Sequence, residues 1–274
     1  MDISIVTACY NAAPTIADCL RSLSSQSYPC EHIVIDGAST DDTLEIVRRV
    51  SPSARILSEP DQGIYDAMNK GLAMVTGEVV GILNADDLYA SPQVLEKVAQ
   101  VFHDPSVMSC YGDLEYVREA RAGGKVQGSG FENPDSTLNI EQGTLDRFTV
   151  VRYWKSGSFT PEKFYWGWMP PHPTFFVRKS VYERYGRFNP DLGSAADYEL
   201  MLRFLLKERI SSTYLPEVLV RMRVGGVSNA SLANRLRANR MDRNAWHVNG
   251  LKPHPWTIPM KPLRKIGQYL QRSS

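Results

Sequence analysis

The chain has 274 residues, of which 43% are hydrophobic, and this composition allows a sizeable core in one large domain or two small ones. Lysine and arginine together number 31 against 30 aspartate and glutamate residues, so the overall charge gives no indication of nucleic-acid binding. From residue 235 onward there are nine basic residues and one acid, a net +8 in a chain whose total is +1, which leaves −7 for the preceding part.

The first residues and the cysteines indicate the compartment. The start "MDISIVTACYN" has an acid at position 2 and no basic segment, and no apolar run approaches the ~18 residues of a membrane span. The four cysteines form no C-x-x-C pair, and three of them lie in apolar segments, which favours buried thiols in a reducing environment. We therefore expect a cytoplasmic protein with neither a signal peptide nor a transmembrane helix.

The first hundred residues alternate short β-rich runs with helical patterns. The runs are "ISIVTA", "HIVIDG", "ARILSE" and "VVGILN", and helices are expected to open at Pro14, after Ser39, from Ile64 and at Pro92. Pro14 and Pro92 suit the first position of a helix, and Ser91 suits an N-cap. This βαβ rhythm predicts a parallel sheet with helices on its faces.

Regular patterns fade between residues 118 and 170, which indicates a long loop or insertion. They return with a strand "TFFVRK", the helices "SVYERYG" and "YELMLRFLLKE", and a strand around "STYLPEVLVRMRV". Residues 171–224 contain too few elements for a core of their own. We therefore expect both halves to share one sheet in a single α/β domain.

Polar side chains are expected to gather at one edge of this sheet, because ligands of open α/β sheets bind outside the carboxyl ends of the strands. The residues that follow the four strands are Thr7, Ala8 and Tyr10, then Asp36, then Glu59 and Asp61, then Asn84, Asp86 and Asp87. No G-x-G-x-x-G follows the first strand and no Walker A motif occurs, which excludes those two types of nucleotide site.

Asp86 and Asp87 are adjacent carboxylates that repel each other when both are ionised. A divalent cation would offset this repulsion, and hard oxygen ligands suit Mg²⁺ or Mn²⁺. The pair thus favours a nucleotide site in which a cation bridges the diphosphate. The alternative is that Asp87 caps the following turn and Asp86 is a solvated loop acid.

Four segments together resemble one enzyme family. They are similar to segments of family-2 glycosyltransferases with the GT-A fold, especially the branch that builds bacterial surface polysaccharides and includes colanic-acid-type transferases. The four segments are "IVTACYNAAPTI", "HIVIDGASTDDTLEI", "SEPDQGIYDAMNKGLAMVTGEVVGILNADD" and "SAADYELMLRF". The resemblance covers residues 1–228. It implies a Rossmann-like, mostly parallel sheet. Residues 1–117 would bind the nucleotide sugar, and residues 118–228 would carry the acceptor site and the catalytic base. Residues 229–274 would form a basic helical extension.

The resemblance also implies an activity. Such enzymes transfer a sugar from a nucleotide sugar, here expected to be UDP-linked, to a hydroxyl of a saccharide or lipid-linked saccharide, with inversion at the anomeric carbon. The expected cofactor is Mn²⁺ or Mg²⁺, and no nucleic-acid partner is expected. The alternative from a different class is a catalytically silent subunit of a polysaccharide assembly complex that only binds a nucleotide sugar.

The nucleotide-binding residues follow from the matched motifs. The resemblance assigns the base and ribose to Thr7, Ala8 and Tyr10, with Asp61 alongside. It assigns the base edge, usually uracil, to Asp36, for which a turn-forming role before Gly37 is the alternative. Where relatives often have D-x-D, this chain has Asn84-Ala85-Asp86, so the metal role falls to Asp86 and Asn84 is left to hydrogen-bond the ribose.

The catalytic base is assigned to Asp197, which in relatives usually follows a glutamate and here follows Ala196. A base must deprotonate the acceptor hydroxyl opposite the departing diphosphate. The alternative is a capping box, with Ser194 as the N-cap and Asp197 three residues on. Three further residues are expected near the acceptor or the diphosphate: His172, which is otherwise structural; Trp168, which is otherwise a packing residue; and Arg223.

The C-terminal stretch "WTIPMKPLRKIGQYLQR" has Leu263, Ile266 and Leu270 at helical spacing among lysines and arginines. This pattern predicts a short cationic amphipathic helix that brings the protein to the inner face of the cytoplasmic membrane. The alternative is a helix that packs on the catalytic domain and exposes its basic face to water.

Overall fold

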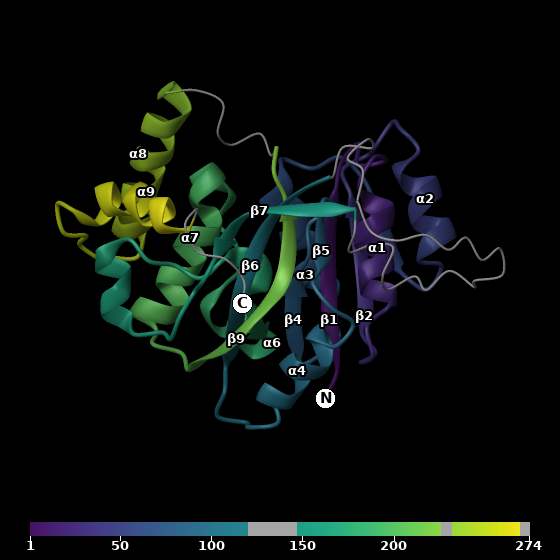
Figure 1. The fold of residues 1–274 in the computed structure, drawn as a ribbon, viewed down its shortest axis with the longest axis horizontal. Helices are drawn as coiled ribbons and strands as arrows, with labels where there is room; N and C mark the ends of the chain where they lie inside the picture. The colour runs from purple at the N-terminus through teal and green to yellow at the C-terminus, as the bar shows by residue number, and fades with distance from the viewer. Residues whose placement is uncertain (120–146, 226–231, 269–274) are drawn as a thin grey trace, which may run out of the picture.

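Nine strands form one sheet in the part of the chain that the structure describes (Figure 1). This computed structural model describes residues 1–119, 147–225 and 232–268. The strand order is β3-β2-β1-β4-β8-β6-β9-β5, with β7 paired to β6 beside this path. The strands are β1 (Ile3–Cys9), β2 (Glu31–Asp36), β3 (Arg55–Ser58), β4 (Val79–Ile82), β5 (Asp87–Tyr89), β6 (Ser109–Glu119), β7 (Phe148–Trp154), β8 (Phe176–Arg178) and β9 (Ser212–Arg223).

Helices connect the strands and cover the sheet (Figure 1). The α-helices are α1 (Ile16–Ser24), α2 (Thr43–Val50), α3 (Ile64–Met74), α4 (Val94–Val101), α6 (Lys179–Tyr185), α7 (Ala196–Met201), α8 (Leu232–Val248) and α9 (Thr257–Gly267). The shorter helical turns are η1 (Pro161–Trp166), η2 (His172–Thr174) and η3 (Pro190–Ala195), and η4 (Leu202–Lys207) continues α7 with π-helical hydrogen bonding.

The four predicted βα units are confirmed, and β3, β2, β1 and β4 are parallel neighbours. Two helices begin later than predicted: α1 begins at Ile16 rather than Pro14, and α4 at Val94 rather than Pro92. For α4 the reason lies in tertiary structure. The side chain of Gln26, beyond the end of α1, accepts a hydrogen bond from the Leu95 amide at 3.0 Å and takes the place of the expected Ser91 cap.

The core is built on both faces of the sheet, and β1 shows why. Ile3 and Ile5 are fully buried against α4, whereas Val6 and Ala8 are buried on the opposite face. Successive side chains of a strand point to opposite faces, so every position of β1 is buried when both faces are covered, and its two polar residues, Ser4 and Thr7, are hydrogen-bonded there. Burial of each such aliphatic side chain stabilises the fold by about 1.5–3 kcal/mol.

The two halves share the sheet, as predicted. β8 pairs antiparallel with β4, with Val79 opposite Arg178, and β6 and β9 continue the sheet from there. The division into residues 1–228 and 229–274 stays a prediction.

The described part of the C-terminal extension packs on the rest of the molecule. The Trp246 indole of α8 is fully buried and donates to the Tyr198 hydroxyl at 3.0 Å. Lys261 of α9 is paired with Asp242 at 2.7 Å, and its ammonium lies 3.4 Å from the centre of the Tyr198 ring. Of the predicted stripe, Leu263 is 54% exposed, while the side chains of Ile266 and Leu270 lie outside the described residues. Among the described residues, no helix has the length and apolarity needed to cross a membrane.

Candidate active site at the carboxyl edge of the sheet

The carboxyl ends of β1 to β4 lie along one edge of the sheet, because these strands are parallel. Backbone hydrogen bonds hold the connecting segments together there: the Gly37 amide donates to the Cys9 carbonyl at 2.9 Å, and the Glu59 amide donates to the Asp36 carbonyl at 3.0 Å. The structure therefore brings the segments after these strands together, as the sequence predicts.

An exposed aromatic ring and a carboxylate meet above Gly37. A Cβ atom on Gly37 would lie 2.5 Å from Asp61 Oδ2 and 3.5 Å from Tyr10 Cδ2, so both side chains approach this glycine. The Tyr10 side chain is 63% exposed, and Asp61 Oδ1 accepts from the Gly63 amide at 2.8 Å. A ring that is open to solvent beside an acceptor suits a flat base that carries N–H groups.

Asp36 lies in a network of hydrogen bonds at the end of β2. It is fully buried, and its carboxylate accepts hydrogen bonds from the Ser39 amide at 3.0 Å, the Ser58 hydroxyl at 2.7 Å and the Ser39 hydroxyl. Its oxygens are therefore engaged in holding the loop after β2 against β3. The alternative of a turn-forming residue describes this geometry, and the expectation that Asp36 reads the base edge stays a prediction.

The side chains of Thr7 and Ala8 also point into the protein. Thr7 is fully buried, with its hydroxyl 3.1 Å from Nε2 of His32, and Ala8 is 5% exposed in the core. Of the three residues expected from this motif, Tyr10 alone presents its side chain to the edge. The periodicity of β1 explains this, because the ligand edge begins only where the strand ends.

The loop after β4 holds two carboxylates in different environments. Asp86 is half-buried, whereas Asp87 is fully buried at the start of β5, where Asn84 Nδ2 donates to its Oδ2 at 2.9 Å. Burial, and next the charge of Asp86, hold the pKa of Asp87 well above its usual range. Asp87 is thus a buried partner of Asn84 rather than a turn cap, and Ala85 between them is 7% exposed.

This loop fits a divalent cation. Within the described residues, the buried oxygens Asn84 Oδ1 and Asp87 Oδ1 have no hydrogen-bond partner, and they stand on either side of Asp86 in the sequence. Unpaired buried oxygens are costly unless a donor or a cation meets them. No group of three or more His, Cys, Asp or Glu in the described part of the chain is arranged to hold a metal alone. A cation here would therefore take further ligands from water and phosphate.

Asp18 and Arg223 lie beside this loop. Arg223 donates to the Asp86 carbonyl oxygen at 3.2 Å and to Asp18 Oδ2 at 2.5 Å. Sequence reasoning expected Arg223 near the diphosphate but missed Asp18, which sits in α1 and is 7% exposed. No local pattern identifies Asp18, because only the strand order brings β9 across to α1.

Asp197 lies in the first turn of α7 and is half-buried. Its Oδ1 accepts from the Tyr198 amide at 2.7 Å. The alternative capping box is wrong, since the N-cap position is Ala195 and the Ser194 hydroxyl lies 3.7 Å from the Met241 sulfur instead. Asp197 is therefore free of a capping box while remaining near a helix N-terminus.

Tyr65 and His172 share the surroundings of Asp197. Burial, and next the charge of Asp197, raise the pKa of Tyr65, which lies in the first turn of α3 just after the Asp61 loop. Burial lowers the pKa of His172, and the charge of Asp197 opposes that effect. The beginning of α3 thus links the Tyr10 and Asp61 side of the edge to Asp197.

Trp168 is buried among other aromatic residues. It is 3% exposed, its indole N–H donates to the Ser156 carbonyl at 2.8 Å, and its ring packs edge-on against Phe164 at 5.3 Å. The alternative of a packing residue describes these contacts, and a place for Trp168 near the acceptor stays a prediction. Trp166, two residues earlier, is 52% exposed.

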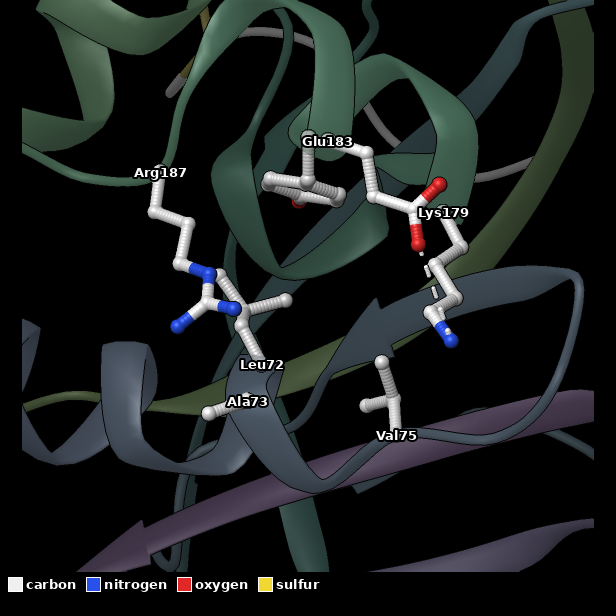
Figure 2. A pocket seen from close by; sticks show the side chains of 7 residues that line it. Leu72, Ala73, Val75, Lys179, Glu183 and Arg187 are labelled. Carbon is white, nitrogen blue, oxygen red and sulfur yellow. Dashed lines mark ion pairs between the residues drawn. The ribbon is translucent and has the colours of Figure 1, made fainter.

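A hollow of about 180 Å³ lies elsewhere, between the end of α3 and α6 (Figure 2). Lys179 and Glu183 form an ion pair on one side of it and Arg187 stands on the other. None of the predicted site residues lines this hollow. The candidate site is therefore the open carboxyl edge rather than this hollow.

The model of glycosyl transferase family 2 matches residues 4–185, more than half of the chain. This chain belongs to glycosyl transferase family 2. A PGL/p-HBAD biosynthesis glycosyltransferase of Mycobacterium bovis (strain BCG / Pasteur 1173P2) is 26% identical over 234 residues, which span 82% of this chain and 78% of the relative.

Solved structures of two proteins resemble nearly the whole chain. S. aureus TarS matches with a TM-score of 0.62 and 17% identity, and the match covers 100% of this chain and 44% of the TarS chain. Its fragment 1–349, in complex with UDP-GlcNAc, matches with a TM-score of 0.59 and 18% identity, and the match covers 99% of this chain and 81% of the fragment. A mannosyltransferase from Pyrobaculum calidifontis, in complex with GDP-Man and Mn²⁺, matches with a TM-score of 0.60 and 19% identity. The match covers 99% of this chain and 76% of the mannosyltransferase chain. The predicted GT-A type fold is confirmed.

Proposed function

We propose that this family-2 glycosyltransferase transfers a sugar from a UDP-sugar, with inversion, to a hydroxyl of a saccharide or lipid-linked saccharide in bacterial surface-polysaccharide synthesis. The observation that carries the proposal is the loop after β4, where the unpaired oxygens of Asn84 and Asp87 accompany the half-buried Asp86. A cation that bridges the diphosphate would satisfy the Asp87 oxygen at the edge where ligands of such sheets bind.

Each end of the nucleotide has a candidate partner. Tyr10 would stack on the base, and the Asp61 carboxylate beside it would accept an N–H of the base edge. Asp86 would hold Mn²⁺ or Mg²⁺, which when bound supplies neutralisation of the charge that develops on the leaving diphosphate. Asn84 Oδ1 is available to accept from a ribose hydroxyl.

Asp197 would act as the general base for the acceptor hydroxyl. The Tyr198 amide donates to its Oδ1, and Tyr65 is a second hydrogen-bond partner of Asp197, so both residues would hold the carboxylate in position. A single displacement at the anomeric carbon, with the hydroxyl entering opposite the diphosphate, gives inversion. His172 would line the acceptor side near Asp197.

The donor base is tested first. A thermal-shift panel of UDP, GDP, dTDP and CDP, each with Mn²⁺, should give the largest stabilisation with UDP, because ligands that bind only the native state raise its stability. The related structures contain UDP-GlcNAc in one case and GDP-Man with Mn²⁺ in the other. A preference for GDP would refute the uridine proposal.

Turnover separates an enzyme from a silent subunit. Hydrolysis or transfer of the preferred nucleotide sugar should be abolished by EDTA and by Asp86→Ala. EDTA-insensitive turnover would refute the metal role of Asp86. Nucleotide-sugar binding with no turnover for any acceptor tested would favour the catalytically silent subunit.

A membrane contact is proposed through one face of α9. Trp256, Pro259 and Leu263 recur at helical spacing and are all exposed, while Thr257 and Ile258 between them are buried. The exposed Trp166 lies 6.0 Å from Trp256 between ring centres. Among the side chains that the structure describes in α8 and α9, the exposed arginines are Arg237, Arg240, Arg243 and Arg264. Aromatic rings among cations suit the interface of an anionic bilayer.

Sedimentation with anionic liposomes tests this contact. The double variant W166A/W256A should lose most of the bound fraction, and high salt should weaken binding of the unsubstituted chain. Val150→Ala, which removes an exposed apolar side chain on β7, is the matched control and should bind normally. Equal binding by all three chains, or no binding by the unsubstituted chain, would refute the contact.

A further inference from the structure

The pairing of β5 with β9 sets Arg223 opposite the proposed metal-binding residue. Asp87 pairs with Met222 and Leu88 with Arg221 in this antiparallel pair. The next residue along β9 is Arg223, which therefore lies opposite Asp86, and its guanidinium donates to the Asp86 carbonyl oxygen at 3.2 Å. The end of one strand thus holds the backbone of the loop after another.

Asp18 fixes the other side of this guanidinium. The Asp18 side chain is 9% exposed and that of Arg223 is 11% exposed, and their closest oxygen and nitrogen are 2.5 Å apart. Asp18 also pairs with Arg147 at 3.3 Å and with Arg21 at 3.2 Å. A buried arginine that is held by a carboxylate loses most of its freedom to move, so its contact with the Asp86 backbone is rigid.

A second ion pair on β9 shows that such pairs are not all equivalent. Arg221 donates to the buried Glu115 of β6 at 3.0 Å, two residues before Arg223. This pair bridges two strands, and the structure gives it no hydrogen bond to the loop after β4. It is likewise an arginine–carboxylate pair with a buried carboxylate, so it serves as a comparison for the hydrogen bond that only the Asp18-bound arginine of the two makes to Asp86.

We infer that Asp18 and Arg223 are positioning residues that hold the Asp86 backbone so that its carboxylate meets the cation of the donor. The inference rests on the proposed function and assigns Asp18 to it. It also gives Arg223 a role different from direct contact with the diphosphate, since two of its guanidinium nitrogens are already bound to Asp86 and Asp18. Partners that orient a metal ligand typically change metal affinity by roughly 10- to 100-fold.

Calorimetric titration of UDP in Mn²⁺ and in EDTA tests the inference on the full chain. Asp18→Asn and Arg223→Lys should each weaken UDP binding in Mn²⁺ by roughly 10-fold or more. Binding in EDTA, which depends on Tyr10 and Asp61, should be unchanged. Glu115→Gln is the matched control and should stay within about two-fold of the unsubstituted chain in both conditions. The spectrum of free Mn²⁺ in electron paramagnetic resonance should report the same loss of bound metal.

The sign of the Asp18→Asn effect separates the inference from its rival. If Arg223 were a diphosphate ligand that Asp18 holds back, Asp18→Asn would tighten binding, and this result would overturn the inference. Unchanged binding in Mn²⁺, or an equal loss in Mn²⁺ and in EDTA, would overturn it as well. If the unsubstituted chain shows no Mn²⁺-dependent nucleotide binding, the proposed function fails together with it. A urea unfolding curve identifies a misfolded Asp18→Asn chain, and Arg223→Lys then decides alone.

Discussion

Asp61 occupies the space in which a side chain at position 37 would stand. A Cβ atom on Gly37 would lie 2.5 Å from Asp61 Oδ2, closer than Cβ atoms of folded proteins approach other heavy atoms. Gly37 has no backbone angle in the left-handed region, so the glycine is required by the carboxylate above it rather than by the turn. Position 37 therefore controls where Asp61 can lie.

Gly37→Ala should displace Asp61 and weaken UDP binding by roughly 10-fold, about 1.4 kcal/mol, with little loss of fold stability. Calorimetric titration of UDP with Mn²⁺ measures the effect. Asp61→Asn, which keeps the shape and removes the charge, serves as the comparison. If Gly37→Ala left the affinity for UDP unchanged, Asp61 would not be part of the base site.

Asp36→Ala should lower the free energy of unfolding by about 1–3 kcal/mol, because Ser39 and Ser58 lose a buried acceptor. Urea unfolding measures the change. Asp42→Ala is the control, since this exposed residue makes no side-chain cap bond at the start of α2 and should change stability by less than about 0.5 kcal/mol. Equal stability of the two variants would show that the Asp36 network contributes nothing.

Asp197→Asn should lower kcat by roughly 10²-fold or more and leave the donor affinity nearly unchanged, because the amide keeps the bond from Tyr198 but accepts no proton. Steady-state kinetics and UDP titration separate the two effects. Ser194→Ala should be silent in both measurements, since Ser194 does not cap α7. A folded Asp197→Asn chain with full turnover would exclude Asp197 as the base.

His32 should make stability depend on pH. Burial lowers its pKa to about 4, from about 6.5 in an unfolded chain. The unfolded state therefore binds more protons than the native state between these values, so the contribution of neutral His32 is complete above pH 6.5 and is lost as pH falls towards 4.

The loss amounts to about 3 kcal/mol at most. His32→Gln should flatten the stability curve across this range, as measured by urea unfolding at several pH values. His103→Gln, at an exposed position, should keep the original slope. A slope that is the same with and without His32 would contradict the assignment.

The sequence predicts the first half of the fold well because local rules act there. Apolar runs such as Ile3–Cys9 are buried on both faces, and each is followed by an amphipathic helix, so period and turn signals agree. The order of β6, β8 and β9 could not be predicted, since it depends on pairings such as Cys110 with Phe176 between distant segments. The sequence gives no local signal for such pairings.

The site was predicted at the level of segments and less well at the level of side chains. Every strand-end segment lies at the expected edge, yet Asp36 and Thr7 turn inward, because a strand-end residue has two possible directions that a motif does not distinguish. The burial of Trp168 could not be predicted, because it depends on packing with Phe159 and Phe164. Asp18 had no signal until α1 and β9 were seen together.

The contacts of Tyr198 with Trp246 and Lys261 join the C-terminal helices to the helix that carries Asp197. Helices that share buried contacts of this kind open together in local unfolding. Amide hydrogens in α7 and α8 are therefore expected to exchange with solvent at similar rates, as one cooperative unit. A chain shortened before α9 would loosen the surroundings of Asp197 as well as removing the basic surface, so point substitutions on α9 are the sharper way to separate attachment from turnover.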